Sequence, residues 1–160
     1  MAGKISQSFS SRAYTIVDDA NFPRVDKQIK IDGDAKAGSP IKYTGGVMSG
    51  SLNITGTVVT DNTDDVNFIV VNEAVGDTPV PNGYARVVGK GAVVSLIASE
   101  AVAVGNDISF DKVEDDTAKA TLGKNVYKVQ EGLETTIAKA LTPATAEGDQ
   151  FLAIITVDII

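Results

Sequence analysis

The chain has 160 residues, a hydrophobic fraction of 43% and a formal net charge of −7, and it contains neither cysteine nor histidine. This length fits a single domain with a sizeable core. The missing residue types exclude disulfides, thiolate metal sites, cysteine nucleophiles and histidine-dependent triads, and the acidic balance argues against binding to nucleic acid or to an anionic membrane.

The apolar residues are largely Val, Ile and Ala, with few aromatics, and 15 Gly and 5 Pro provide frequent turns. This combination is typical of many short strands and predicts an all-β protein with little helix. We expect a small β-barrel or β-sandwich-like domain with an extended N-terminal arm. The first residues lack the apolar run of a secretory signal, so we expect synthesis in the cytoplasm.

Residues 1–28 are polar and rich in serine, and no periodicity would let them build a core of their own. We interpret this segment as the arm and residues 29–160 as the β-rich domain. A terminus without fixed structure is the alternative. Aromatic and arginine side chains are the types that anchor protein interfaces. The interface candidates in the arm are Phe9, Arg12, Tyr14, Phe22 and Arg24.

The first half of the domain shows strand patterns between turn signals. Ile29–Ile31 and Pro40–Tyr43 are predicted strands, and alternation places Ile41 and Tyr43 on one face. The Gly-rich and Ser-rich residues between Gly45 and Gly56 predict a hairpin or mobile loop. We expect two β-branched runs, Thr57–Thr60 and Val66–Val71, to pair with each other. Two prolines and Asn82-Gly83 mark a tight connection at residues 77–83.

The central stretch, Tyr84–Phe110, is predicted to be the sheet core, with a turn at Gly89-Lys90-Gly91. Further strands are expected at Ala118–Thr121, Val126–Gln130 and Thr135–Leu141. The last could instead form one helical turn, which Pro143 would end. The closing residues 150–160 alternate little, which predicts a strand that is buried on both faces.

One short pattern recurs three times: a glycine, two turn-forming residues or their near equivalents, and then an alternating strand. It begins at Gly38, Gly105 and Gly148. Glycine accepts a positive φ without steric cost, so each copy predicts a turn that starts a strand. Chance recurrence in a Gly-rich β protein is the alternative, and the unequal spacing argues against a solenoid.

Candidate catalytic and phosphate-binding motifs mostly fail on geometry. Ser39–Lys42 and Ser109–Lys112 match a serine-lysine signature, but residues three apart on a strand point to opposite faces. Gly89–Gly91 lacks the surroundings of a phosphate loop. The sequon at Asn53 needs a secretory route. We therefore expect no enzymatic activity and no cofactor.

Acidic clusters offer oxygen ligands that calcium could use in flexible loops. None follows the full calcium-loop pattern, so we interpret them as solvated turn residues, with a weak calcium site at residues 61–65 as the alternative. The clusters are Asp32/Asp34, Asp61/Asp64/Asp65 and Glu114/Asp115/Asp116.

Three segments carry a resemblance to a known family: Gly83–Val94, Ala103–Phe110, and Ile137–Asp149 leading into Phe151–Ile160. Their Val-rich strand, Val-Gly-Asn-Asp turn and closing Ala-Leu and Gly-Asp segment resemble the head decoration, or capsid cement, proteins of tailed bacteriophages. The resemblance covers about residues 35–160. It implies a small β-barrel-like domain of the β-tulip type.

The resemblance also implies a function. It predicts a structural protein of the virion that binds the major capsid protein on the outer surface of an icosahedral shell, as a homotrimer, and stabilises contacts between capsomers. A tail, fibre or adhesin β-domain shares every compositional feature and is the alternative. A carboxylate-based hydrolase is a third hypothesis, which would require a partly buried pair of acids in a cleft.

Overall fold

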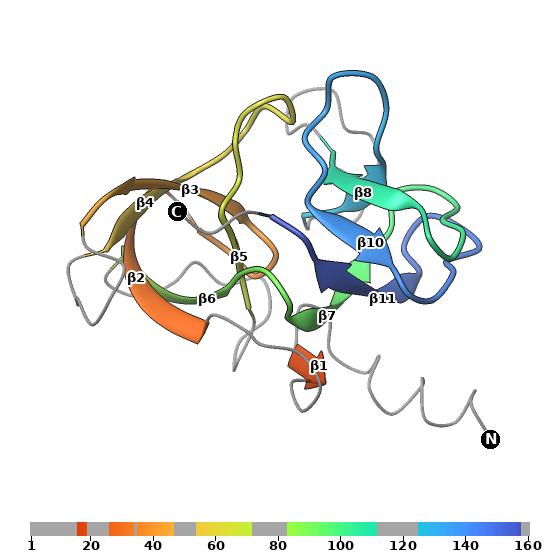
Figure 1. Ribbon diagram of the computed structural model, residues 1–160, viewed down its shortest axis with the longest axis horizontal. Helices are drawn as coiled ribbons and strands as arrows, with labels where there is room; N and C mark the ends of the chain where they lie inside the picture. Colours follow the sequence, from red (N-terminus) through yellow and green to blue (C-terminus); the bar gives the residue numbers. More distant parts are fainter. Residues whose placement is uncertain are drawn as a thin grey trace.

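The computed structural model describes residues 16–18, 26–33, 35–46, 54–71, 83–111 and 125–157, and this part of the chain contains strands but no α-helix. The all-β prediction is confirmed. Two bodies lie side by side, a closed barrel and an open sheet (Figure 1). Across the described residues, no helix has the length and apolar character needed to cross a membrane.

The barrel closes five strands in the order β2-β4-β3-β5-β6, with β6 pairing back onto β2. The β2–β4 pair is parallel and the other pairs are antiparallel. Apolar side chains of all five strands or their ends fill the interior. The strands are β2 (Asp26–Asp32), β3 (Pro40–Gly45), β4 (Thr55–Val58), β5 (Phe68–Val70) and β6 (Tyr84–Val88).

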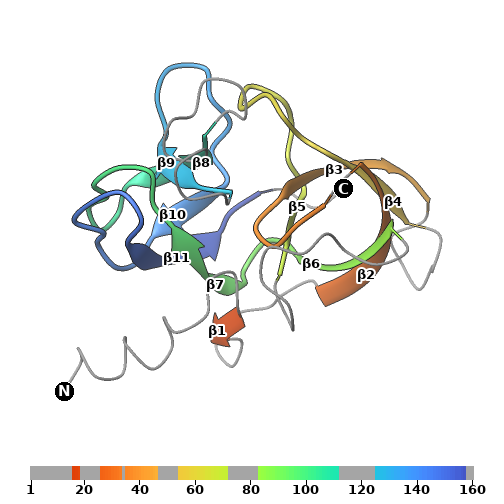
Figure 2. The ribbon, with the colours of Figure 1, turned by 180° about the vertical axis from the view of Figure 1, so that it is seen from behind.

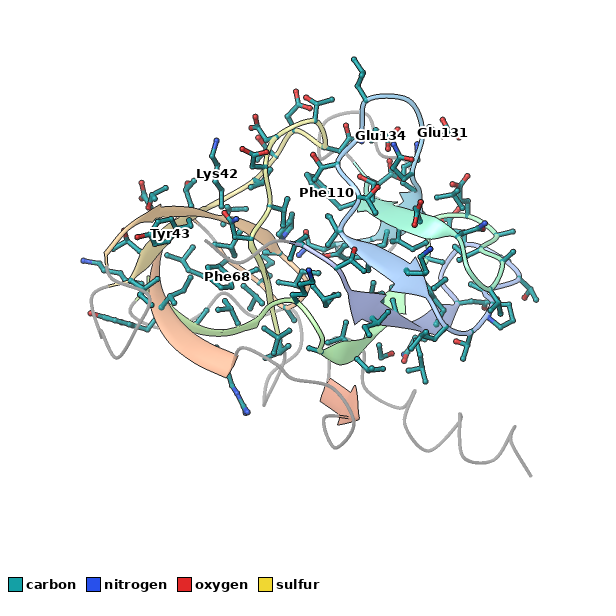
Figure 3. All side chains as sticks on the ribbon, in the orientation of Figure 1. Lys42, Tyr43, Phe68, Phe110, Glu131 and Glu134 are labelled. Atoms are coloured by element: carbon teal, nitrogen blue, oxygen red, sulfur yellow. The ribbon has the colours of Figure 1, made fainter. Side chains whose placement is uncertain are left out.

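The barrel is narrow, and Gly56 shows how narrow it is. A Cβ atom on Gly56 would lie 2.5 Å from Ile41 Cγ2 and 3.0 Å from the backbone oxygen of Lys42. Ile41 and Phe68 are fully buried inside the barrel, and Tyr43 packs against the same cluster, as the alternation of β3 predicts (Figure 3). Glycine is therefore required at this point by close packing, not by backbone conformation.

The second body is a six-stranded antiparallel sheet in the order β1-β7-β11-β10-β8-β9. Its longest pairing joins β7 to β11, from Ile97 opposite Gln150 to Val93 opposite Ile154. The strands are β1 (Ile16–Asp18), β7 (Val93–Ile97), β8 (Asp107–Phe110), β9 (Tyr127–Val129), β10 (Ala138–Ala140) and β11 (Gln150–Ile155).

The chain visits the sheet twice, because β1 belongs to the sheet, β2 to β6 form the barrel, and β7 to β11 return to the sheet. The predicted central stretch, Tyr84–Phe110, therefore divides between the two bodies. Its turn at Gly89–Gly91 carries the chain from β6 of the barrel to β7 of the sheet, as the reversed view also shows (Figure 2).

The barrel packs against the sheet through its outer face. In β5, Phe68 and Val70 point into the barrel, whereas Ile69 joins the core shared with the sheet. Val88 at the end of β6 joins the same shared core. The run Phe68–Val71 is apolar at every position because it lies between two hydrophobic cores.

The recurring glycine pattern is confirmed as one turn used three times. Gly38, Gly105 and Gly148 have φ values of 81°, 85° and 89°, and β3, β8 and β11 each begin two residues later. In the second copy, the backbone N–H of Asn106 donates to the carbonyl of Ala103, and Asn106 Oδ1 accepts the N–H of Ala103 in return. Ser39 with Lys36, and Asp149 with Ala146, repeat this reciprocal pair.

Two sequence predictions about strands are wrong. The runs around β4 and β5 do not pair with each other, because β3 lies between them in the barrel. Residues 150–155 are not buried equally on both faces: Phe151 and Ala153 are buried, whereas Leu152 and Ile154 are half-buried. One sheet face covers the shared core and the other is partly open.

Other predictions fall outside or across the described residues. The strand expected at Ala118–Thr121 lies outside them, as does nearly all of the connection at residues 77–83. The segment Thr135–Leu141 contains strand β10, as expected. The boundary that we expected after residue 28 falls within β2, where Asp26 pairs with Val88 in closing the barrel.

Candidate interaction surface

The predicted interface residues of the arm, Phe9, Arg12, Tyr14, Phe22 and Arg24, lie outside the described residues. The part of the arm region that is described contributes β1 and the start of β2. β1 pairs with β7, with Ile16 opposite Val94 and Asp18 opposite Val93, and the register shifts between these two pairs. A segment that precedes the barrel thus adds a short strand to the sheet.

The sheet has two terminal strands, β1 and β9, and the edge at β9 is largely covered. The carbonyl of Tyr127 accepts the backbone N–H of Ser99 at 2.8 Å, and the N–H of Val129 donates to Glu100 Oε1 at 3.0 Å. These contacts occupy backbone groups of β9 that would otherwise be available to an incoming strand. The barrel is closed, so β1 is the other terminal strand among the described residues.

A polar joint connects the barrel to the sheet beneath these surfaces. The hydroxyl of Tyr127 donates to the carbonyl of Gly38, and Asn125 Nδ2 donates to the carbonyl of Ala37 at 3.0 Å and contacts Ser39 Oγ at 3.2 Å. Tyr127 is fully buried, and burial raises its pKa far above the ordinary value of a tyrosine. The Tyr127 hydroxyl therefore keeps its proton, and its hydrogen bond fixes the turn at Gly38 in the barrel to the sheet.

The connection between β9 and β10 forms a braced turn at the upper end of the molecule, where Glu131 and Glu134 are labelled in Figure 3. The N–H of Glu134 donates to the carbonyl of Glu131 at 3.0 Å. Lys128 Nζ lies 3.0 Å from Glu134 Oε1 and 3.6 Å from Glu131 Oε2. Gln130 Nε2 donates to the carbonyls of Gly132 and Glu134.

The ammonium group of Lys128 holds this turn by charge. Desolvation on its own lowers the Lys128 pKa, but the hydrogen bond with Glu134 and the negative charges of Glu134, Glu131 and Asp111 outweigh it and leave the pKa above its ordinary value. Lys128 therefore remains charged at neutral pH, and both carboxylates of the turn keep their partner.

The acidic loop at residues 61–65 contacts the braced turn and uses one of its acids in its own structure. Asp61 Oδ1 accepts the backbone N–H and the hydroxyl of Thr63. Thr135 donates its N–H to the carbonyl of Asn62 and its hydroxyl to the carbonyl of Asp64, both at 2.7 Å. Among the described residues, no three acids gather closely enough to hold a metal ion, and residues 114–116 and Asp34 lie outside that set.

The serine-lysine matches serve packing in the parts that are described. Ser39 is buried, and its Oγ accepts the N–H of Lys36 within the turn before β3. Ser109 is fully buried in β8, its Oγ has no partner among the described residues, and Lys112 lies outside them. Among the described residues, no hydrogen bond joins Ser39 to Lys42, the lysine that the first match would require.

Sequence reasoning missed the exposed apolar side chains on the loops. Leu133 is 92% exposed on the braced turn. Val104 and Leu141 are also exposed, and each is next in sequence to a residue of the hydrogen bond from Gly105 N–H to the carbonyl of Ala140. The available signal was a leucine placed outside any strand alternation, in the sequence Glu131-Gly-Leu-Glu134. Such side chains are candidates for contacts with other proteins.

No protein-family model matches the chain, and no curated protein matches it in sequence. Among solved structures, the chain is similar to the N base of head fiber gp8.5 in bacteriophage phi29, with a TM-score of 0.47 and 15% sequence identity. The similarity covers 86% of this chain and 98% of that chain. At this level of likeness, neither the fold nor the role of the head fiber protein carries over to this chain.

Proposed function

We propose that the protein is a structural component of a phage virion, which binds the outer surface of the icosahedral capsid and stabilises contacts between capsomers. The observation that carries the proposal is the pairing of β1 with β7. There, a segment that precedes the barrel engages a sheet edge by strand addition, which is a recognised mode of protein binding.

The rest of the molecule suits a rigid body with adhesive edges. The barrel is closed and joined to the sheet by Tyr127 and Asn125, and the edge at β9 is covered by Ser99 and Glu100. These features limit strand addition at the β9 edge and leave β1 as the other terminal strand among the described residues. A body of this kind gains binding strength when many copies each make a modest contact with one shell.

The proposed partners follow from the same role. The major capsid protein is the binding partner, and the protein acts as a homotrimer on the shell, with no cofactor and no catalytic activity. The formal charge of −7 offers no favourable contact to nucleic acid or to an anionic membrane. The resembling segments include β6, the first two residues of β7, β8, β10 and most of β11, and thus much of the sheet that receives β1.

Sedimentation of the protein with capsids assembled in its absence tests the proposal, with electron microscopy to locate it. We expect the full chain to sediment with the shell and to occupy its outer surface. If electron microscopy located the protein on the tail or fibres alone, the tail or fibre alternative would be supported. Failure to bind the shell and absence from virions would refute the proposal.

The boundaries of the strands define the truncation to use. Removing residues 1–25 deletes β1 but keeps all of β2, whereas removing residues 1–28 also deletes three residues that pair with β6. We expect the shorter deletion to weaken shell binding while the barrel stays folded, as measured by circular dichroism and thermal unfolding. Unchanged binding by this variant would remove the arm from the mechanism.

A further inference from the structure

Leu133 is the most exposed large apolar side chain among the described residues, at 92%. It occupies the third position of the turn Glu131–Glu134, immediately after Gly132, whose φ is 54°. A single exposed leucine is common on protein surfaces and by itself indicates nothing. The support beneath this leucine distinguishes it.

Three sets of contacts hold the turn in place. Lys128 forms ion pairs with both Glu131 and Glu134, and the side chain of Gln130 donates to two carbonyls of the turn. Thr135 ties the following residue to the loop at residues 61–65. Because the turn is already ordered, a partner that covers Leu133 pays little conformational entropy to do so.

The charge next to Leu133 indicates which partner fits. Glu131 is exposed on the same turn, and Asp64 and Asp65 are exposed on the loop that Thr135 contacts. A partner that buries the leucine brings its own rim close to these carboxylates, and a basic rim would be attracted to them. An acidic rim would be repelled, which would select against such partners.

We propose that Leu133 is the anchor of a protein-binding site, whose partner presents an apolar socket bordered by lysine or arginine. The site consists of Leu133, Glu131, Asp64 and Asp65. It lies on the loop between β9 and β10 and on the loop between β4 and β5, apart from the β1 edge used in the proposed shell contact. The site does not depend on that contact.

A selection from random peptides displayed on yeast tests this site without any capsid. The full-length protein is the bait, and the recovered peptides are titrated against it at low and at physiological salt. We expect peptides that combine apolar residues with flanking lysine or arginine. Replacing Leu133 with Ser should lower their affinity about thirtyfold, as the loss of a hot-spot residue does.

Val104 provides the matched control, because it is also exposed, at 63%, but lies on a different loop. Val104→Ser should leave peptide affinity unchanged. The double variant Asp64→Asn, Asp65→Asn should weaken binding and reduce its dependence on salt. Both leucine and valine variants replace exposed side chains, so thermal unfolding should match that of the unchanged protein.

The proposed site would be refuted if the recovered peptides bound the Leu133→Ser variant as tightly as the unchanged protein. It would also be refuted if their affinity depended on Val104, or if they carried no excess of basic residues. A selection that returns no specific binder would also refute it. Because no shell is present, these outcomes are separate from success or failure of capsid binding.

Discussion

The hydroxyl of Tyr127 in β9 donates a hydrogen bond to the carbonyl of Gly38, a residue 89 positions earlier in the turn before β3. This contact joins the sheet to the barrel at a point where both partners lie in the interior. Gly38 also donates its N–H to the carbonyl of Val70, so the turn is held on both sides. The relative position of the two bodies therefore depends on a small number of buried polar contacts.

Replacing Tyr127 with Phe keeps the aromatic ring and removes the donor to Gly38. We expect a loss of about 1 to 3 kcal/mol in the free energy of unfolding, because a buried carbonyl loses its partner. Urea denaturation measures this loss. Tyr43→Phe is the matched control: its hydroxyl donates to the carbonyl of Gly46 at an exposed site, and its removal should cost at most about 0.5 kcal/mol. Equal losses of unfolding free energy in the two variants would contradict the stabilising role assigned to the Tyr127–Gly38 hydrogen bond.

Alkaline pH should weaken the fold through the same side chain. Burial raises the pKa of Tyr127 above the ordinary value of 10.0, so above that pH the unfolded chain loses its phenolic proton while the folded chain retains it. The unfolded state then binds fewer protons, and stability falls as pH rises, by about 1.4 kcal/mol per pH unit. Unfolding curves at a series of pH values should show that the unchanged protein is more stable than Tyr127→Phe at neutral pH and that this difference in unfolding free energy shrinks above pH 10. A constant difference would be inconsistent with a buried, neutral phenol.

Acid should weaken one of the repeated turns but not its counterpart. The hydroxyl of Thr145, followed by the backbone N–H groups of Ala146 and Thr145, lowers the pKa of Asp149 below its ordinary value of 3.8. The contribution of Asp149 is therefore complete above that pH and is lost as pH falls through the folded pKa. Asn106 accepts the equivalent N–H, from Ala103, and does not titrate.

Alanine variants of these two residues, unfolded at neutral pH and in acid, make the comparison. Asp149→Ala should be less stable than the unchanged protein at neutral pH, and the difference should diminish in acid. Asn106→Ala should cost about 1 kcal/mol under both conditions. If the two variants responded to pH in the same way, the assigned role of the Asp149 carboxylate would be wrong.

Gly56→Ala should destabilise the barrel by about 1 to 3 kcal/mol, because the added Cβ would overlap Ile41 Cγ2. Removing that γ-carbon with Ile41→Ala should reduce the cost of Gly56→Ala, and a double-mutant cycle measures the coupling. Gly105→Ala is the control. Its Cβ would meet nothing within 4 Å, so its cost of about 1 to 2 kcal/mol arises from φ alone and should be independent of Ile41.

The positions of many strands and turns could be predicted because their causes are local. The turns at Gly38, Gly105 and Gly148 require only a glycine with positive φ and an acceptor one residue later, and both are visible in the sequence. The alternation of Ile41 and Tyr43 likewise reports one face of one strand.

Strand partners could not be predicted, because pairing depends on contacts between distant segments. The run Phe68–Val71 has an all-apolar pattern that fits several neighbours, and β5 in fact lies between β3 and β6. The uniform pattern of residues 150–155 also concealed a half-buried face at Leu152 and Ile154.

The candidate sites also depend on contacts between distant segments, which the sequence does not show. The exposure of Leu133 depends on the ion pair by which Lys128 holds the β9–β10 loop. The covering of the β9 edge depends on Glu100, which lies 29 residues before Val129 in the sequence. No local pattern encodes either relationship. The arm residues were selected by side-chain type alone, and they remain a prediction.

The order β1-β7-β11 has a mechanical consequence. β1 and β11 both run antiparallel to β7, so they run parallel to each other on its two sides. Tension applied between the two ends of the chain would enter through β1, cross β7 and leave through β11. Such a force shears both ladders along their length instead of opening them one bond at a time. While β1 stays attached, the barrel lies outside the path of the force.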